Sequence, residues 1–258
     1  GKIEARVEVA TLLKNDTVAE QVEVAVFAQN HDGPGIKWQA LPMPGLLGPG
    51  NNWLRGELAI PKPRTWECST PWLYQLQVRV LDKDGKLLDT ARRQFGLRSF
   101  VIREDGARQG RIELNGREIR LRGANTMGYE QLDVMRGDTR QLVDDLLLGK
   151  ACNMNFLRIT QRPVQEEIYD YCDRLGVMVQ TDLPLFGFLR RSQFAEGVRQ
   201  AGEMERLIRS HPACILVSWI NEPFPASWGL MDWRHLDRAE LLSFMDCSGQ
   251  MVRFHNPD

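Results

Sequence analysis

The stretch NFLRITQRPVQEEIYDYCDRLGVMVQTD, residues 155–182, contains one complete strand–helix–strand unit. Residues 155–160 and 177–182 are short, mostly apolar runs of the kind that form buried strands. Between them, Pro163 suits the first position of a helix and Gly176 suits its end. Strands joined in this way by a helix are parallel, so the stretch predicts part of an α/β sheet.

The same rhythm continues on both sides of this unit. Residues 118–125 are a strand candidate, and Asp138, with Gln141 three residues later, predicts the start of the helix that follows. Downstream, residues 194–210 have the pattern of a helix and residues 214–221 that of a fourth strand. A fourth helix is expected to begin near residue 235. Four such units are half of a (β/α)₈ TIM barrel.

A half-barrel would leave two apolar strand edges unpaired, which is a strong aggregation hazard. Either the sequence is truncated or another chain completes the barrel, and truncation is the favoured interpretation. We therefore expect residues 99–258 to be the N-terminal half of a TIM-barrel domain. The first residues, Gly1-Lys2-Ile3-Glu4-Ala5, alternate in polarity like the middle of a strand and lack an apolar signal core. They predict that a natural N-terminus precedes them.

Residues 1–98 have a different periodicity. Residues 3–9 and 22–26 alternate between apolar and polar positions, and turn-separated runs continue this pattern to residue 94. Asp82-Lys83-Asp84-Gly85 predicts a hairpin turn, whereas the Gly- and Pro-rich residues 32–51 predict a long surface loop. The first 98 residues are therefore expected to form an all-β, immunoglobulin-like sandwich.

Composition excludes several classes of function. The net charge of −1 gives no reason to expect a nucleic-acid partner. No apolar run approaches the roughly 20 residues that cross a bilayer, so no membrane association is expected. The five cysteines are scattered and never in CxxC spacing, which favours buried thiols over a metal or redox site. No cofactor is expected. The sequence indicates neither the cellular compartment nor the oligomeric state.

Candidate catalytic residues follow from the barrel pattern, because active sites of such barrels lie at the C-terminal ends of the strands. Glu222 directly follows the apolar run at residues 215–220 and precedes Pro223. Partial burial beside Trp219 would raise the pKa of this carboxyl group, as a carboxylic general acid requires. The alternative is an Asn-Glu pair that caps the next helix or pairs with an arginine.

Four other strand-end residues are candidates for substrate binding. Arg158 would need anions around it inside a barrel mouth, and its alternative is a structural salt bridge. Asn125 could hydrogen-bond substrate, orient Glu222 or fix a loop, and Asp182 could bind a hydroxyl group of the substrate or cap a turn. Trp219 could stack on a ring of the substrate, although core packing explains aromatic residues more often. Weaker candidates for the cleft are Met127, Tyr129, Phe186, Phe188 and Trp228.

Several motifs resemble those of glycoside hydrolase family 2, which includes β-galactosidases, β-glucuronidases and β-mannosidases. Leu114-Asn115-Gly116-Arg117 through Arg122-Gly123-Ala124-Asn125 resembles the family's first barrel segment, and Ser218-Trp219-Ile220-Asn221-Glu222-Pro223 resembles the segment that carries its acid/base. The remaining matching segments are residues 71–74, 95–98, 155–158, 168–176 and 211–217.

The resemblance implies a retaining glycosidase that acts on an oligosaccharide or glycoside. Glu222 would be the general acid/base, and Asn221 would contact the 2-hydroxyl of the sugar. The nucleophile, a glutamate on a later strand, would lie beyond the end of this chain. The 258-residue piece alone is therefore expected to be inactive.

The sequence departs from the family pattern at three substrate-binding or metal-binding positions. Gln161 and Met127 stand where the family usually has histidines, and Thr181-Asp182-Leu183 stands in place of Asp-Glu-Ala. These changes leave the sugar and its linkage open, and no metal site is expected. They also add weight to the alternative to hydrolysis, a non-catalytic carbohydrate-binding or scaffold protein on the same fold.

Overall fold

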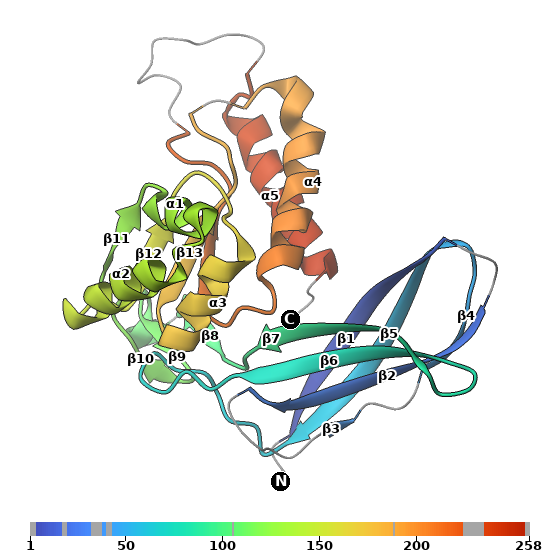
Figure 1. The fold of residues 1–258 in the computed structure, drawn as a ribbon. Helices are drawn as coiled ribbons and strands as arrows, with labels where there is room; N and C mark the ends of the chain where they lie inside the picture. The colour runs from blue at the N-terminus through green and yellow to red at the C-terminus, as the bar shows by residue number, and fades with distance from the viewer. Residues whose placement is uncertain are drawn as a thin grey trace. The chain divides into compact units, whose positions relative to one another are not determined.

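The computed structural model describes residues 4–16, 20–31, 38–39, 43–104, 106–187, 189–223 and 235–255 (Figure 1). Its contacts divide the chain into two compact units. One unit comprises residues 1–66 and 72–97, and the other comprises residues 67–71 and 98–258. No helix within the described ranges is long and apolar enough to cross a membrane.

The first unit is the predicted β-sandwich. Strands β1 (Glu4–Asn15) and β5 (Gly50–Pro61) pair antiparallel along their whole length. The facing sheet is also antiparallel and has the order β3-β2-β6-β7, with β4 also paired to β2. Its strands are β2 (Glu20–Asn30), β3 (Trp38–Gln39), β4 (Met43–Leu47), β6 (Tyr74–Asp82) and β7 (Leu87–Phe95).

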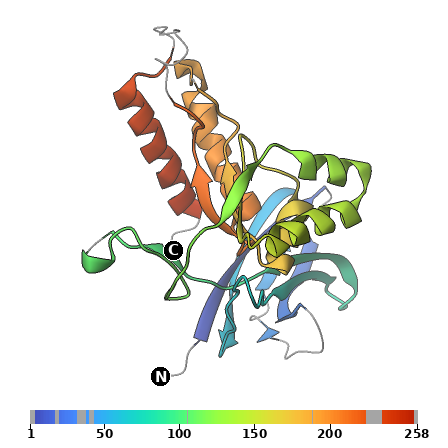
Figure 2. The same cartoon turned by 90° about the vertical axis from the view of Figure 1, so that its left-hand side faces the viewer.

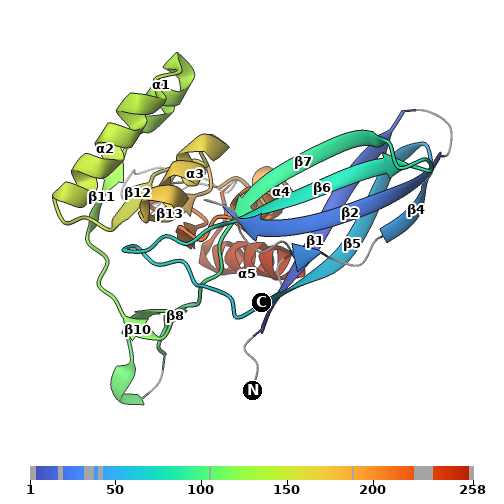
Figure 3. The same ribbon diagram turned by 60° about the horizontal axis from the view of Figure 1, so that its bottom comes forward.

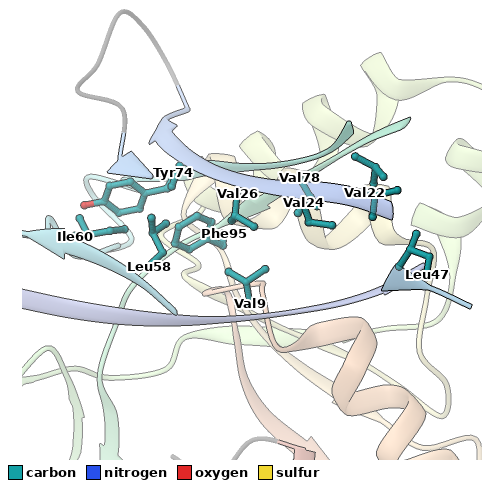
Figure 4. Packing of buried hydrophobic residues seen from close by; sticks show 12 residues of the cluster. Val9, Val22, Val24, Val26, Leu47, Leu58, Ile60, Tyr74, Val78 and Phe95 are labelled. Atoms are coloured by element: carbon teal, nitrogen blue, oxygen red, sulfur yellow. The ribbon is translucent and has the colours of Figure 1, made fainter. Parts of the chain in front are cut away.

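The alternating residues of these strands form the core of the sandwich. Val24 and Val26 of β2, with Leu58 and Ile60 of β5, are fully buried. Figure 4 shows side chains of the two sheets meeting in the space between them. Burying each such side chain stabilises the fold by about 1.5–3 kcal/mol, so the period-2 pattern fixes which face of each strand points inward.

One expectation for this unit was confirmed and one was wrong. Asp82 accepts hydrogen bonds at Oδ1 from the backbone N–H of Asp84 (2.9 Å) and Lys86 (2.8 Å), which closes the predicted hairpin. Residues 32–51, however, are not simply a loop, because β3, β4 and the start of β5 fall within this range. Pro44 and Gly45 lie within β4 itself, so a Gly- and Pro-rich composition did not exclude strand structure here.

The second unit contains a parallel four-stranded sheet of order β11-β12-β13-β14. The strands are β11 (Gly123–Thr126), β12 (Phe156–Ile159), β13 (Met178–Asp182) and β14 (Cys214–Ser218). The helices are α1 (Tyr129–Arg136), α2 (Thr139–Ala151), α3 (Glu166–Leu175), α4 (Phe194–Ile208) and α5 (Arg238–His255). Figures 2 and 3 show these helices around the sheet, with α4 and α5 side by side. This is the predicted partial barrel.

Strand and helix limits differ from the expectation at two places. The strand expected over residues 118–125 is split: β10 (Arg117–Glu118) joins β9 (Ile112–Leu114) and β8 (Phe100–Ile102) in a separate small sheet. Helix α3 begins at Glu166 instead of Pro163. Val164, which precedes the helix, donates its backbone N–H to the side-chain hydroxyl of Tyr169 (3.2 Å).

A buried polar cluster anchors the N-terminal end of β14. Asp173 of α3 is fully buried and bonds Nδ1 of His211 (2.7 Å) and the backbone N–H of Ala213 (2.9 Å). Arg98 donates from Nε to the carbonyl of Pro212 (2.9 Å), and burial lowers the pKa of this guanidinium. These contacts hold the strand that leads to Glu222.

Two helices end on glycines in the same left-handed conformation, Gly137 (φ 72°) after α1 and Gly176 (φ 69°) after α3. A Cβ at Gly176 would lie 2.3 Å from the Cys68 carbonyl oxygen, whereas one at Gly137 would meet nothing within 4 Å. Both Gly→Ala changes incur the left-handed penalty of about 1–2 kcal/mol. We expect Gly176→Ala to cost about 1–3 kcal/mol more in urea unfolding. Equal losses in the two variants would contradict the close packing at Gly176.

Candidate active site

The register of the parallel sheet sorts its side chains onto two faces. Asn125, Arg158 and Gln180 are paired across β11, β12 and β13, and Asp182 is paired with Ser218 of β14. Paired residues on neighbouring strands point to the same side, and so do residues two apart on one strand. Asn125, Arg158, Gln180 and Asp182 therefore share one face, at the C-terminal end of the sheet.

Helices cover the opposite face. Ile159 and Thr181 are buried there. The Thr181 hydroxyl shares a 2.8 Å hydrogen bond with the hydroxyl of Tyr169 in α3, whose pKa is raised by burial. The Thr126 hydroxyl donates to the buried carboxylate of Glu130 in α1. Because this face is occupied by helices, the polar face is the side on which a substrate could be recognised.

Asp182 is the centre of a hydrogen-bond network on the polar face. Its side chain is 0% exposed, and Arg158, with a side chain 24% exposed, donates to it from Nη2 (2.7 Å) and Nε (3.4 Å). Asp182 also accepts from Nε2 of Gln180 (3.2 Å) and from the backbone N–H of Gln161 (3.1 Å). A buried ion pair needs such additional hydrogen bonds to offset the desolvation of both charges.

Arg158 links this network to the segment after β14. Its Nη2 also donates to Oδ1 of Asn221 (2.7 Å). The Asn221 backbone is held on both sides, because its N–H donates to the carbonyl of Leu185 (2.9 Å) and its carbonyl accepts from Gly187 (2.8 Å). The predicted residues Arg158, Asp182 and Asn221 are thus joined in one chain of hydrogen bonds.

Glu222 directly follows this chain of contacts and has an unusual backbone conformation. Its φ is 51°, in the left-handed region that non-glycine residues seldom adopt. Backbone strain of this kind is concentrated at functional sites. Glu222 is exposed, which differs from the partial burial expected beside Trp219, itself half-buried.

The other predicted site residues lie at the same end of the sheet. Asn125 is exposed at the end of β11, and Met127, Tyr129 and Phe186 are exposed in the segments that follow β11 and β13. Burial, with a smaller contribution from Glu130, raises the pKa of Tyr129 to about 12. Phe188 and Trp228 lie outside the described residues.

Two residues of the network were not predicted as part of the site. Gln161 has a left-handed backbone (φ 68°), and Gln180 lies two positions before Asp182. The period of the strand could have indicated Gln180, since residues 180 and 182 must share a face. Gln161 stands at a position that the family resemblance marks as substrate- or metal-binding, but its contribution comes from its backbone N–H, which the residue type does not indicate.

One group of described residues could offer ligands to a metal ion. Atoms of Glu166, Asp170 and His211 lie within 4.8 Å of one another. His211 precedes β14, at the end of the strand opposite to Asn221 and Glu222, and its Nδ1 is bonded to Asp173. This group is therefore separate from the polar face of the sheet.

Comparison with known proteins identifies both units. Residues 2–98 match the family model described as Glycosyl hydrolases family 2, and residues 107–239 match Glycosyl hydrolases family 2, TIM barrel domain. A β-galactosidase of Aeromonas hydrophila subsp. hydrophila is 31% identical over 174 residues, which are 64% of this chain and 16% of that protein. A putative β-glucuronidase of Formosa agariphila is 31% identical over 125 residues, which are 48% and 15% of the two chains.

Solved structures show the same fold. A β-glucuronidase of Bacteroides uniformis matches 98% of this chain and 31% of its own, with a TM-score of 0.81 and 22% identity. A putative β-galactosidase of Bacteroides fragilis matches 99% of this chain and 36% of its own, with a TM-score of 0.76 and 17% identity. The chain thus spans about a third of the length of these structures.

Proposed function

The chain belongs to glycosyl hydrolase family 2, and from this premise we propose that the protein hydrolyses β-glycosidic bonds with retention of configuration. Glu222 is the general acid/base in this proposal. The observation that carries it is the position of Glu222. It follows Asn221 at the C-terminal edge of the parallel sheet, and Asn221 is bonded to the buried pair Arg158–Asp182. Its strained backbone supports the same assignment.

The proposed reaction has two steps, each with a task for Glu222. In the first, Glu222 protonates the departing glycosidic oxygen while a second carboxylate attacks the sugar carbon from the other face. In the second, Glu222 takes a proton from water, which releases the sugar from its ester with that carboxylate. The two carboxyl groups of such enzymes lie about 5–5.5 Å apart. We place the second, a glutamate, beyond residue 258, as the family resemblance implies.

Asn221 is proposed to bind the 2-hydroxyl of the sugar. An arginine can only donate hydrogen bonds, so the atom of Asn221 that faces Arg158 at 2.7 Å is the amide oxygen. The Asn221 amide group then has both N–H donors available on its other side. Hydrogen bonds to the 2-hydroxyl strengthen as the transition state forms, which makes such a donor catalytically useful.

The remaining predicted residues would complete the substrate side of the site. Asn125 is exposed on the same face as Arg158, where its amide could bind a further hydroxyl. Trp219 is half-buried beside Asn221 and could stack against a sugar ring. Arg158 would place its positive charge near the two catalytic carboxylates. Asp182 belongs to the same network, in which it binds Arg158 directly.

The proposal is tested by the stereochemistry of the first product. The full-length protein is incubated with 4-nitrophenyl β-galactoside and β-glucuronide, because relatives bear the names β-galactosidase and β-glucuronidase. Proton NMR then follows the anomeric signals before mutarotation. We expect the β-anomer first with at least one substrate. Initial release of the α-anomer would contradict the retaining mechanism, and binding without hydrolysis would favour the carbohydrate-binding alternative.

A further inference from the structure

We propose that Asp182 is a positioning residue that acts on the 2-hydroxyl of the sugar through Arg158 and Asn221, without touching the sugar itself. The inference rests on the proposed function, because it assigns a task within that site. The hydrogen-bonding capacity of the Asp182 carboxylate is fully used by protein groups. A carboxylate offers about four lone-pair positions, and this one accepts from Arg158 Nη2, Arg158 Nε, Gln180 Nε2 and Gln161 N–H. With its side chain 0% exposed, Asp182 has no oxygen position left for a sugar hydroxyl.

Asp182 fixes the orientation of the Arg158 guanidinium group. A guanidinium group is planar, so two hydrogen bonds from Nε and Nη2 to one carboxylate fix the plane in which its other N–H groups lie. The same Nη2 reaches Oδ1 of Asn221 at 2.7 Å. Asp182 therefore determines where the donor that holds Asn221 is located.

Arg158 in turn fixes the orientation of the Asn221 side chain. Its backbone is fixed by hydrogen bonds to Leu185 and Gly187, so the principal remaining freedom is rotation of its side chain. Arg158 removes that freedom by binding the amide oxygen, which directs the two amide N–H groups away from Arg158. An amide that is held before substrate arrives loses less conformational entropy when it binds.

Asp182 also holds the turn that follows β12. Gln161 has a left-handed backbone, and its N–H donates to Oδ2 of Asp182, the same oxygen that accepts from Arg158 Nη2. The carboxylate thus connects the end of β12, through Arg158 and Gln161, to the segment after β14. A neutral amide cannot replace it, because the Asp182→Asn change would turn N–H groups toward one of these donors.

The test compares Asp182→Asn in the full-length protein on two substrates, an aryl β-glycoside with its 2-hydroxyl and the matched 2-deoxy glycoside. If Asp182 acts through Asn221, the variant loses a contact that the 2-deoxy substrate never makes. We expect kcat/KM to fall about 10- to 100-fold on the hydroxylated substrate, the range for a hydrogen bond strengthened by charge. On the 2-deoxy substrate we expect a change below about threefold. Equal losses on both substrates would overturn the inference.

Asp173→Asn is the matched control. Asp173 is another fully buried carboxylate with hydrogen bonds at β14, but it lies at the N-terminal end of the strand. A purely structural loss there should lower the thermal stability and change both rates by the same factor. A split between the substrates in this control would also overturn the inference, because the readout would then report general damage.

Two further measurements keep the outcome decisive. If Asp182→Asn does not fold, Arg158→Lys tests the same chain of contacts, because a lysine keeps the charge but lacks the planar fork. In this variant kcat/KM should fall further on the hydroxylated substrate than on the 2-deoxy substrate, and equal losses would overturn the inference. Hydrolysis by the unmodified protein distinguishes a failure of the proposed function from a failure of the role of Asp182 alone. If it hydrolyses both substrates with retention but Asp182→Asn gives equal losses, only the role of Asp182 fails, whereas absence of hydrolysis overturns the proposed function and this inference together.

Discussion

Glu222→Gln is expected to lower kcat/KM by about 10²- to 10⁴-fold on glycosides whose leaving group is a poor one, such as a sugar or an alkyl alcohol. A glutamine has the shape of glutamate but cannot donate the proton that such a leaving group needs. A 2,4-dinitrophenyl glycoside of the same sugar leaves without protonation, so kcat/KM for it should change by less than about tenfold. The measurement is kcat/KM for a series of aryl and alkyl glycosides, plotted against the pKa of the leaving group.

The slope of that plot decides the role of Glu222. Loss of the acid makes the rate of the variant depend steeply on the leaving group, whereas the unmodified protein should show a shallow dependence. Glu203→Gln is the matched control, because Glu203 is an exposed glutamate of α4 paired with Arg199. It should reproduce the slope of the unmodified protein. The same loss of rate on all leaving groups in Glu222→Gln would count against a proton-donating role.

Arg158→Met is expected to cost about 3–5 kcal/mol in the free energy of unfolding, together with most of the activity. The change leaves the Asp182 carboxylate, whose side chain is 0% exposed, without its cation. Removing one partner of a buried ion pair is far more destabilising than removing both, because the uncompensated charge stays desolvated. Chemical unfolding of the variant measures the loss.

Two comparisons show whether burial causes this effect. Arg199→Met removes an arginine that binds Glu196 at 2.7 Å, but with a side chain 54% exposed, and should change the free energy of unfolding far less, because water already screens that pair. The double change Arg158→Met with Asp182→Leu should recover part of the stability lost in Arg158→Met, since no buried charge remains. A stability of Arg158→Met close to that of Arg199→Met would mean that the Arg158–Asp182 pair is solvated in solution.

Much of the fold follows from periodicity in the sequence. Alternation with period two identified β1, β2, β5 and β6, because each has one face that contributes to the core between the sheets. The pattern also predicted β7, although only its last two residues are buried. The strand–helix rhythm after residue 99 identified the four parallel strands. Gly176 was correctly predicted as the end of α3, where its left-handed conformation is required.

The failures have physical causes that local patterns do not contain. Residues 118–125 were read as one strand because apolar and polar positions alternate through them, yet β10 pairs with β9 and β11 with β12. Helix α1 was missed because its buried residues are Glu130 and Asp133, so it lacks the apolar stripe that marks most helices. In α2, Leu142 and Leu146 are buried but Leu147 is exposed, so the buried face is narrower than the run of apolar residues in the sequence.

The candidate site likewise contains features that the sequence predicted and features that it did not. The rule that strand ends carry function selected Arg158, Asp182 and Asn221, and Arg158 is hydrogen-bonded to both of the others. Their roles, and those of Glu222, Asn125 and Trp219, remain predictions. The rule could not find Gln161, because its link to Asp182 uses the backbone N–H. The left-handed conformation of Glu222 was likewise invisible before the structure, since any residue type except glycine makes it unexpected.

Rescue of a Glu222→Ala variant by azide tests the assignment of Glu222 most directly. Without the acid/base, a glycosyl intermediate formed from a 2,4-dinitrophenyl glycoside lacks the base that activates water, whereas azide attacks without needing one. We predict that millimolar azide restores turnover and that the product is the β-glycosyl azide, identified by NMR. Turnover that is indifferent to azide, or an α-glycosyl azide as the product, would contradict Glu222 as the acid/base of a retaining enzyme.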